Sequence, residues 1–277
     1  MIQYPRLDQA SNEIVDLEAH RILSRFRGSH GGHINLAINT LDFRPFMDSE
    51  IQPAFEGPVS KLLVKEVSLW SKMIGRKSVR QLLLSHPFAL LEPYQLTEVM
   101  HALASHFSLS EAADRRYVAA SNIREIGSQH IALLKGLGFN HYQLITDYRD
   151  LAEMSLIRNA MRQIRQFAFR SVSIQVRDAD CLDDLRGHIQ ELTRECSPSF
   201  IFVGNRPKLL NIDPAQQEPG TIIFDGEDDV TDNTLTLGLE EKSFFDGLEI
   251  ENFCDPQRYL NALESGRLPI HPFHHQR

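Results

Sequence analysis

The stretch His33-Ile34-Asn35-Leu36-Ala37-Ile38-Asn39 decides how the rest of the chain is interpreted. Polar and apolar residues alternate along it, which is typical of a β-strand. An amphipathic helix is expected before it over residues 11–27, because Ser11 can cap its start and Gly28 can end it. A second helix is expected after it, from a cap at Ser60 to an end at Gly75. The chain therefore opens with a helix, a strand and another helix.

The same alternation continues along the chain. Further strands are predicted at residues 79–84, 117–120, 142–145, 171–176 and 200–203, and further helices at 94–107, 123–137, 151–167 and 182–195. Strand-then-helix steps of roughly 30–40 residues imply parallel strands joined by right-handed crossovers. No Gly-x-Gly-x-x-Gly phrase follows the first strand, which disfavours a dinucleotide-binding sheet. The predicted fold class is α/β, a partial (β/α)6 TIM-like barrel of parallel strands with a truncated C-terminal part.

The last quarter of the chain has a different composition. Residues 211–233 are rich in Pro, Gln, Asp and Gly, and they predict an exposed loop around one strand at 221–224. A further strand is expected at 235–239 and a short helix at 257–263. We expect a single barrel-type domain over residues 1–277, divided into an N-terminal helix (1–30), βα repeats (31–204) and a loop, late strands and tail (205–277).

Composition limits the classes of function. The 277 residues are 42% hydrophobic and 24% charged, which is typical of a folded protein. The net charge of −8 disfavours nucleic acid as a partner, and Arg158, Arg162, Arg165 and Arg170 are interpreted as a solvated helix face. No apolar run approaches the roughly 20 residues that span a bilayer, and the first residues do not resemble a signal peptide. A cytoplasmic protein without a membrane partner is expected.

Cysteine and histidine give weak signals. Cys181, Cys196 and Cys254 lie at no CxxC spacing, which favours reduced thiols over disulfides. Cys181 is a poor nucleophile, because the neighbouring carboxylates of Asp178 and Asp180 raise a thiol pKa. A metal or haem ligand in the tail (His271, His274 and His275) and a cation loop at 225–232 are both disfavoured. Both segments are expected to be solvated.

Several phrases of the sequence resemble the oxygen-independent coproporphyrinogen III oxidase family of radical S-adenosylmethionine enzymes. The matching phrases are GRKSVRQL (75–82), YQLTEVM (94–100), NIRE (122–125), LKGLGFN (134–140), LGL (237–239) and QRYL (257–260). The resemblance covers most of the chain, in the order of elements and in scattered residues. It implies a partial (β/α)6 barrel that is open on one side and shaped for a large propionate-bearing substrate.

The sequence departs from this family where the family holds its iron–sulfur cluster. The resemblance implies a C-x-x-x-C-x-x-C loop after the first strand, whose thiolates bind the irons. The matching residues 40–48 contain no cysteine, and none occurs before Cys181. His30, His33, Asp42 and Asp48 are poor substitutes, since carboxylates suit such clusters badly.

The matched cofactor pocket also departs from the family. Leu84-Ser85-His86-Pro87-Phe88 stands in place of the family's GGGTP strand end, whose glycines let the backbone approach the cofactor. The other matched positions differ as well, at Ala120, at Asp147-Tyr148 and at 175–181. We therefore expect neither an iron–sulfur cluster nor S-adenosylmethionine as a cofactor. The expected function is that of a catalytically inactive relative that acts as a binding or regulatory protein.

Two other functions stay open. One is an enzyme with different, non-radical chemistry at the barrel mouth, where acid–base side chains are expected: Asn39, Asp42, His86, Asn122, Asp147, Asp178 and Asn205. The other is a structural partner in a protein complex, for which a large exposed apolar patch is expected.

The expected ligand follows from the resemblance. A tetrapyrrole or other small acidic ligand is expected at the strand ends, because Arg44, Arg177 and Arg206 can pair with propionates. His86 can approach an iron centre, and Tyr148 completes the predicted contacts.

Overall fold

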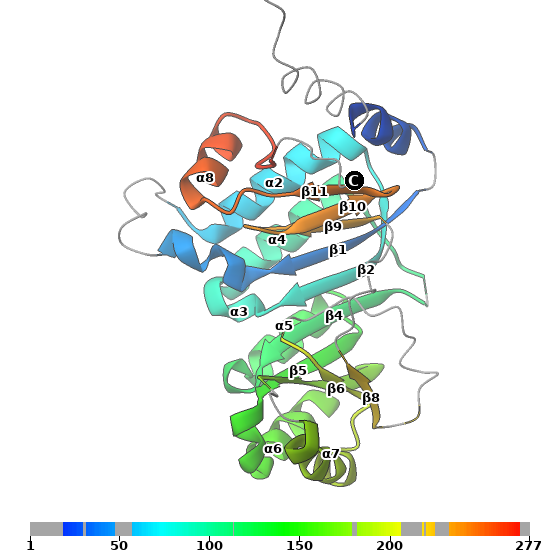
Figure 1. The fold of residues 1–277 in the computed structure, drawn as a ribbon, viewed down its shortest axis with the longest axis vertical. Coiled ribbons are helices and arrows are strands. Elements are labelled where there is room, and N and C mark those ends of the chain that lie inside the picture. Colours follow the sequence, from blue (N-terminus) through cyan, green and yellow to red (C-terminus); the bar gives the residue numbers. More distant parts are fainter. Residues whose placement is uncertain are drawn as a thin grey trace, which may run out of the picture.

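The central sheet has the predicted parallel core. The computed structural model describes residues 19–29, 32–47, 57–112, 114–178, 182–205, 218, 220–224 and 233–271 (Figure 1). The six predicted strands are β1 (His33–Asn39), β2 (Ser78–Ser85), β4 (Arg116–Asn122), β5 (His141–Asp147), β6 (Ser171–Arg177) and β7 (Phe200–Val203). Each pairs in parallel with the next. The expected α/β fold with a partial, TIM-like parallel barrel is confirmed.

Shorter strands extend the sheet on both sides. Its order is β11-β10-β9-β1-β2-β4-β5-β6-β7-β8, with β3 (Ser108–Leu109) beside β2. β8 (Thr221–Phe224) lies at one edge, while β9 (Thr234–Leu237), β10 (Lys242–Phe245) and β11 (Leu248–Glu251) lie at the other. Figure 1 shows these edges far apart, so the described sheet does not close into a barrel.

Helices follow the parallel strands as predicted, with two differences. They are α2 (Val59–Ile74), α4 (Pro93–His106), α5 (Ser128–Gly136), α6 (Met154–Arg165) and α7 (Leu182–Cys196). The helix expected at 123–137 is split, because Gly127 is extended between the 3-10 turn η3 (Ile123–Glu125) and α5. The helix expected at 151–167 is likewise η4 (Tyr148–Ala152) followed by α6, with Glu153 between them.

Ser60 does not cap α2, contrary to the prediction. Pro58 occupies the cap position, and the Ser60 hydroxyl donates to Glu98 Oε2 of α4 at 2.9 Å. The predicted end at Gly75 is confirmed, where a φ of 79° suits glycine. The N-terminal helix is described over residues 19–28, which agrees with the expected end of the 11–27 helix.

The C-terminal part contains more structure than expected. The strand predicted at 235–239 ends earlier as β9, because Gly238 turns the chain with a φ of 131°. The hairpin of β10 and β11 was not predicted. Outside this part, the short helix α3 (Pro87–Leu90) was not predicted either. The predicted helix at 257–263 is confirmed as α8 (Pro256–Glu264).

Packing separates the two faces of the sheet. Side chains such as Leu36, Leu82 and Leu144 pack with the helices in one large core. The opposite face has only a small apolar cluster, formed by Leu83, Ala120 and Ile145. Since strand side chains alternate between faces, the remaining positions on that second face are available for polar groups.

Candidate ligand site at the carboxyl ends of the strands

The carboxyl ends of the parallel strands share one edge of the sheet, at the left of Figure 1. The segments that follow them form a rim: η1 (Thr40–Met47) after β1, α3 after β2, η3 after β4 and η4 after β5. Active and binding sites of barrel proteins lie at this edge. The rim has two halves that differ in their packing.

The β1 half of the rim is built as core. Phe43 and Phe46 of η1 are 0% and 1% exposed, and their rings lie 6.1 and 5.6 Å from that of Tyr259 on α8. Asn39 Nδ2 donates to Asp42 Oδ1 at 2.9 Å, so the Asp42 carboxylate is held at the end of β1. Arg44 remains exposed on this turn. The segment that resembles the cluster loop is therefore a 3-10 turn packed against α8.

A buried polar cluster supports this half of the rim. We define the Glu66 cluster as Glu66 of α2, Asn252 and Tyr259. Asn252 Nδ2 donates to Glu66 Oε1 at 2.9 Å, and the Tyr259 hydroxyl donates to Glu66 Oε2. Burial raises the pKa of Glu66 to about 8, so the carboxyl is protonated at neutral pH. The cluster therefore joins α2 to α8 through a hydrogen-bonded neutral acid.

Gly238 ties the Glu66 cluster to η1. Asn252 Nδ2 also donates to the Gly238 carbonyl at 2.6 Å. A Cβ at Gly238 would lie 3.3 Å from Asp42 Cβ and 3.4 Å from the Phe43 ring. The close approach explains why the turn after β9 requires a glycine.

His86 is part of the scaffold at the end of β2. Its backbone is left-handed, with a φ of 52°, and its side chain is 3% exposed. The His86 N–H donates to the Ala120 carbonyl at 2.6 Å, and Nδ1 lies 3.4 Å from Glu125 Oε2. Phe88 stacks on His130 with ring centroids 4.0 Å apart. The segment that resembles the glycine-rich strand end is thus occupied by a buried imidazole and a stacked phenyl ring.

The β5–β6 half of the rim is open. A hollow of about 400 Å³ is lined by Asp147, Tyr148, Arg149 and Asp178. Arg177 contacts Asp147 Oδ1 through Nε at 2.9 Å and through Nη2 at 2.7 Å. These contacts hold the Asp147 carboxylate at one wall. Arg149 is exposed, and no described acid forms an ion pair with it.

The loop ends around this hollow are positioned by backbone contacts. Asp178 has a left-handed φ of 54°, and its N–H donates to Asn205 Oδ1 at 3.0 Å. The Tyr148 ring meets His188 of α7 edge-on, with centroids 5.7 Å apart. The structure thus brings Asp147, Tyr148, Arg177 and Asp178 together at the neighbouring ends of β5 and β6.

Buried amides lie on the same face of β5 and β6, deeper in the sheet. Gln143 and Gln175 are 2% and 0% exposed and contact each other at 3.4 Å, while Gln175 Nε2 donates to the Gly204 carbonyl at 2.7 Å. The sequence interpretation missed both residues. Their signal was present, because polar residues at alternate positions of a buried parallel strand are unusual.

The other predicted contact residues do not join the hollow. Asn122 caps η3, where its Oδ1 accepts the Arg124 N–H at 2.9 Å. Asp42, Arg44 and His86 belong to the β1 half described above. Arg206 lies outside the described residues, as do Asp48, Cys181, the acidic loop 225–232, His274 and His275.

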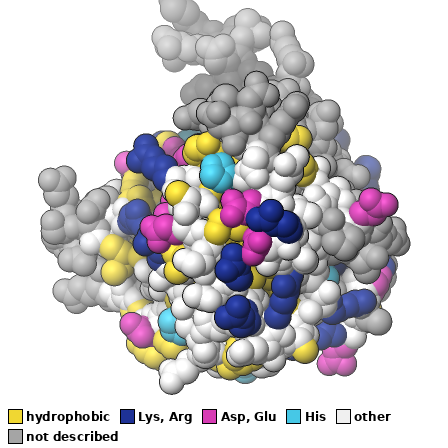
Figure 2. All heavy atoms as spheres, turned by 90° about the horizontal axis from the view of Figure 1, so that it is seen from below, with side chains coloured by type: hydrophobic (Ala, Val, Ile, Leu, Met, Phe, Trp, Pro, Cys, Tyr) yellow, Lys and Arg dark blue, Asp and Glu magenta, His cyan; other side chains and the backbone are white. Residues whose placement is uncertain are grey.

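The arginines of α6 have structural contacts. Arg158 pairs with Glu195 at 2.8 Å, Arg162 contacts Asn159 at 3.4 Å, and Arg165 donates to the Ser197 carbonyl at 2.6 Å. Figure 2, which views the molecule from its α6–α7 end, shows basic side chains gathered there with acidic ones beside them. These contacts agree with a solvated helix face.

The described residues offer neither a metal cluster nor a membrane span. No group of three metal-binding side chains occurs among them. None of the helices in the described part of the chain has the length and apolar character needed to cross a membrane.

Comparisons with known proteins match the fold and not the sequence. No protein-family model and no curated protein matches the chain. Among solved structures, coproporphyrinogen III oxidase (HemN) from Escherichia coli, a radical SAM enzyme, aligns over 92% of this chain and 74% of its own, with a TM-score of 0.64 and 13% identity.

Two further structures are less similar. The hydrogenase maturase HydG has a TM-score of 0.38 and 14% identity, over 78% of this chain and 51% of its own. The N-terminal domain of a putative aldolase from Bacteroides vulgatus has a TM-score of 0.37 and 10% identity, over 61% and 54%. Together with the open parallel sheet, the match shows that this chain has a fold similar to that of HemN.

Proposed function

We propose that this chain is a ligand-binding protein that uses a radical SAM-type fold without an iron–sulfur cluster or S-adenosylmethionine. Its site is the β5–β6 hollow, and its ligand is a small molecule that carries carboxylates. The observation that carries the proposal is the difference between the two halves of the rim, one packed as core and the other open and charged.

The packing of η1 supports the absence of cluster chemistry. The turn offers no thiol, because the three cysteines of the chain are Cys181, Cys196 and Cys254. Its two phenylalanines are buried against α8, so the turn is held by packing and needs no metal to order it. The buried His86 and the stacked Phe88 support the absence of a cofactor at the end of β2 in the same way.

The lining of the hollow, one guanidinium and two carboxylates, suits a ligand that carries both hydrogen-bond acceptors and donors. Arg149 can donate two parallel hydrogen bonds to a carboxylate. Asp178 and Asp147 present carboxylates that can accept N–H groups. A tetrapyrrole with propionate arms has both kinds of group, and HemN is by name an oxidase of such a molecule. We therefore propose a tetrapyrrole as the first ligand to test.

The test has two parts. Anaerobic incubation of the full chain with iron and sulfide is expected to leave it without the visible absorption of a bound cluster. Titration with coproporphyrin is expected to change the porphyrin fluorescence at micromolar concentrations. A stable cluster would overturn the first part of the proposal, and an unchanged porphyrin spectrum, with haemin also inactive, would overturn the choice of ligand.

An enzyme with acid–base chemistry is the second candidate, and one observation favours it. His86 and Glu125 lie 3.4 Å apart near the rim, an arrangement suited to proton transfer. A substrate must reach the imidazole for this role, yet its side chain is 3% exposed. Rapid modification of His86 by diethyl pyrocarbonate in the folded protein would favour the enzyme, while protection until unfolding would exclude this pair.

A further inference from the structure

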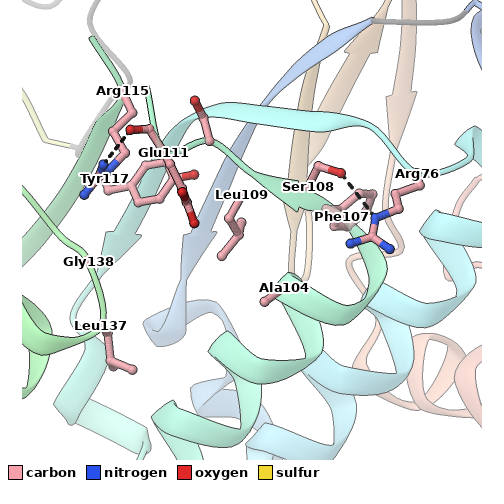
Figure 3. Close-up of a pocket in the computed structure, with 11 residues that line it drawn as sticks. Arg76, Ala104, Phe107, Ser108, Leu109, Glu111, Arg115, Tyr117, Leu137 and Gly138 are labelled. Atoms are coloured by element: carbon pink, nitrogen blue, oxygen red, sulfur yellow. Dashed lines mark hydrogen bonds between the residues drawn. The ribbon is translucent and has the colours of Figure 1, made fainter. Parts of the chain in front are cut away.

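A second hollow lies near the amino-terminal ends of the strands, away from the rim (Figure 3). Its volume is about 760 Å³, within the range of roughly 300–1,000 Å³ that small-molecule sites occupy. It forms where β2 and β4 separate. The two residues of β3 pair with Ser78 and Val79 of β2, whereas β4 pairs with β2 only from Gln81 onward.

The walls of this hollow are mixed, with an apolar part set among polar and charged side chains. Phe107 is buried at the end of α4, Leu109 of β3 is partly buried, and Leu137 follows α5. Tyr117 is buried beside these residues, and its ring is held in place because its hydroxyl donates to the Val79 carbonyl at 3.0 Å. A Cβ at Gly138 would meet nothing within 4 Å, so the hollow is open on this side. The apolar surface open to a ligand is thus that of Ala104, Leu109 and Leu137.

Two guanidinium groups flank the apolar wall. Figure 3 shows Arg115, Glu111 and Tyr117 on one side and Arg76 with Ser108 on the other, with Leu109 between them. Arg76 Nε donates to Ser108 Oγ at 3.2 Å, and Arg115 Nη1 donates to the Glu111 carbonyl at 3.2 Å. The Arg115 guanidinium also lies 5.8 Å from the Tyr117 ring centroid.

These arginines differ from others in the structure. Within the described residues neither Arg76 nor Arg115 forms an ion pair, whereas Arg80 pairs with Asp114 at 2.5 Å and Arg124 with Asp150 at 2.7 Å. Glu111 is the acid that lines the hollow, so two guanidiniums face one carboxylate and the hollow has a net positive charge. The partly exposed side chains of Leu109 and Leu137 beside this positive charge favour an anion with an apolar body.

We propose that this hollow binds a small organic anion, with its apolar body against Leu109 and Leu137 and its acid group on Arg76 or Arg115. The site is distinct from the rim, and the proposal does not depend on the ligand of the rim. Ligand recognition here requires both charge and shape, which gives the proposal two separate tests.

The charge test uses the fluorescent probe anilinonaphthalene sulfonate and its uncharged analogue phenylnaphthylamine. The full chain is expected to bind the sulfonate more tightly than it binds the uncharged phenylnaphthylamine. The double variant Arg76→Gln/Arg115→Gln should lose about tenfold in sulfonate affinity, because charge-assisted hydrogen bonds are removed. Glu111→Gln should strengthen sulfonate binding, and Arg162→Gln, on the distant α6, should leave it unchanged. Equal affinity of the two probes, or equal loss in the Arg162 variant, would overturn the proposal.

The shape test fills the hollow. Ala104 is an exposed residue of α4 that lines it, so Ala104→Trp inserts a large ring without disturbing the core. The variant should retain the circular dichroism of the wild type and lose sulfonate binding. Sulfonate fluorescence that survives in this folded variant would mean that the probe binds elsewhere, and it would overturn the assignment of the site.

Discussion

The two halves of the rim stand at the same edge of the same sheet, yet they are built differently. At the β1 end, Phe43 and Phe46 are buried against α8, and the Glu66 cluster joins the helices beneath them. At the β5–β6 end, Asp147, Arg149 and Asp178 border an open hollow. One half is held by buried aromatic area and the other by charged groups in contact with solvent.

This difference separates fold from function. The strand order and the similarity to HemN are properties of the whole fold. Chemistry depends instead on the side chains at each strand end. The β1 half has side chains that serve stability. We propose that the side chains of the β5–β6 half serve recognition. Variants in the two halves should therefore differ in what they change.

The largest expected effect is on stability, from Phe43→Ala. Phe43 is 0% exposed, so its removal leaves a cavity and should lower the free energy of unfolding by about 3–5 kcal/mol. Urea denaturation measures this change. Arg44→Ala is the matched control on the same turn: the side chain is exposed, and the expected change is within about 0.5 kcal/mol. Similar small effects from both variants would mean that η1 is not part of the core.

The next effect is the pH dependence of stability through Glu66. Its pKa rises from 4.5 to about 8 on folding, because burial disfavours the carboxylate. The folded state thus holds a proton that the unfolded state has lost. The contribution of Glu66 to the free energy of unfolding should be fully present below pH 4.5. It should be lost as the pH rises from 4.5 to about 8.

Glu66→Gln isolates this contribution, because the amide has a similar shape and does not titrate. Urea midpoints measured across that pH range should fall less steeply in the variant than in the wild type. The gap should amount to a few kcal/mol at the alkaline end, on the order that the shift implies. Parallel pH profiles would show that Glu66 is ionised in the folded protein, and the account of this half would be wrong.

A smaller effect on stability is expected from Arg177→Gln in the other half. The ion pair with Asp147 is partly exposed, with side chains 23% and 34% accessible, and such pairs contribute at most about 1 kcal/mol. The free energy of coproporphyrin binding should change more than the free energy of unfolding, because Asp147 loses the partner that positions it. Calorimetry gives the first quantity and fluorescence titration the second. A loss of stability without a change in binding would assign Arg177 to the scaffold.

Sequence patterns predicted the regular parts of the molecule well. The parallel strands and the ends of α2, α4 and α7 follow from apolar periodicity and from residues such as Gly75. The break at Gly127 and the β10–β11 hairpin were missed, because short segments bury too little apolar surface to leave a periodic signal. The prediction that Ser60 caps α2 was wrong, because its hydroxyl donates to Glu98 of another helix, a contact that no local pattern reveals.

The candidate site was predicted in part. Asp147, Tyr148, Arg177 and Asp178 meet because the ends of β5 and β6 are neighbours, which parallel topology implies. His86 and Asn122 were expected at the same mouth, but each is used locally, one in a buried turn and the other as a cap. Which strand-end side chains face a ligand depends on how segments far apart in the sequence pack together. Local sequence patterns do not predict that packing.

The most direct test compares one arginine from each half in the same coproporphyrin titration. Arg149→Gln removes the guanidinium that faces the β5–β6 hollow, and Arg44→Gln removes the exposed one on η1. We predict that the Arg149 variant loses about tenfold or more in affinity, as expected for a charge-assisted carboxylate contact, and that the Arg44 variant binds as the wild type does. Loss of binding in the Arg44 variant alone would place the ligand over the β1 half and contradict the account.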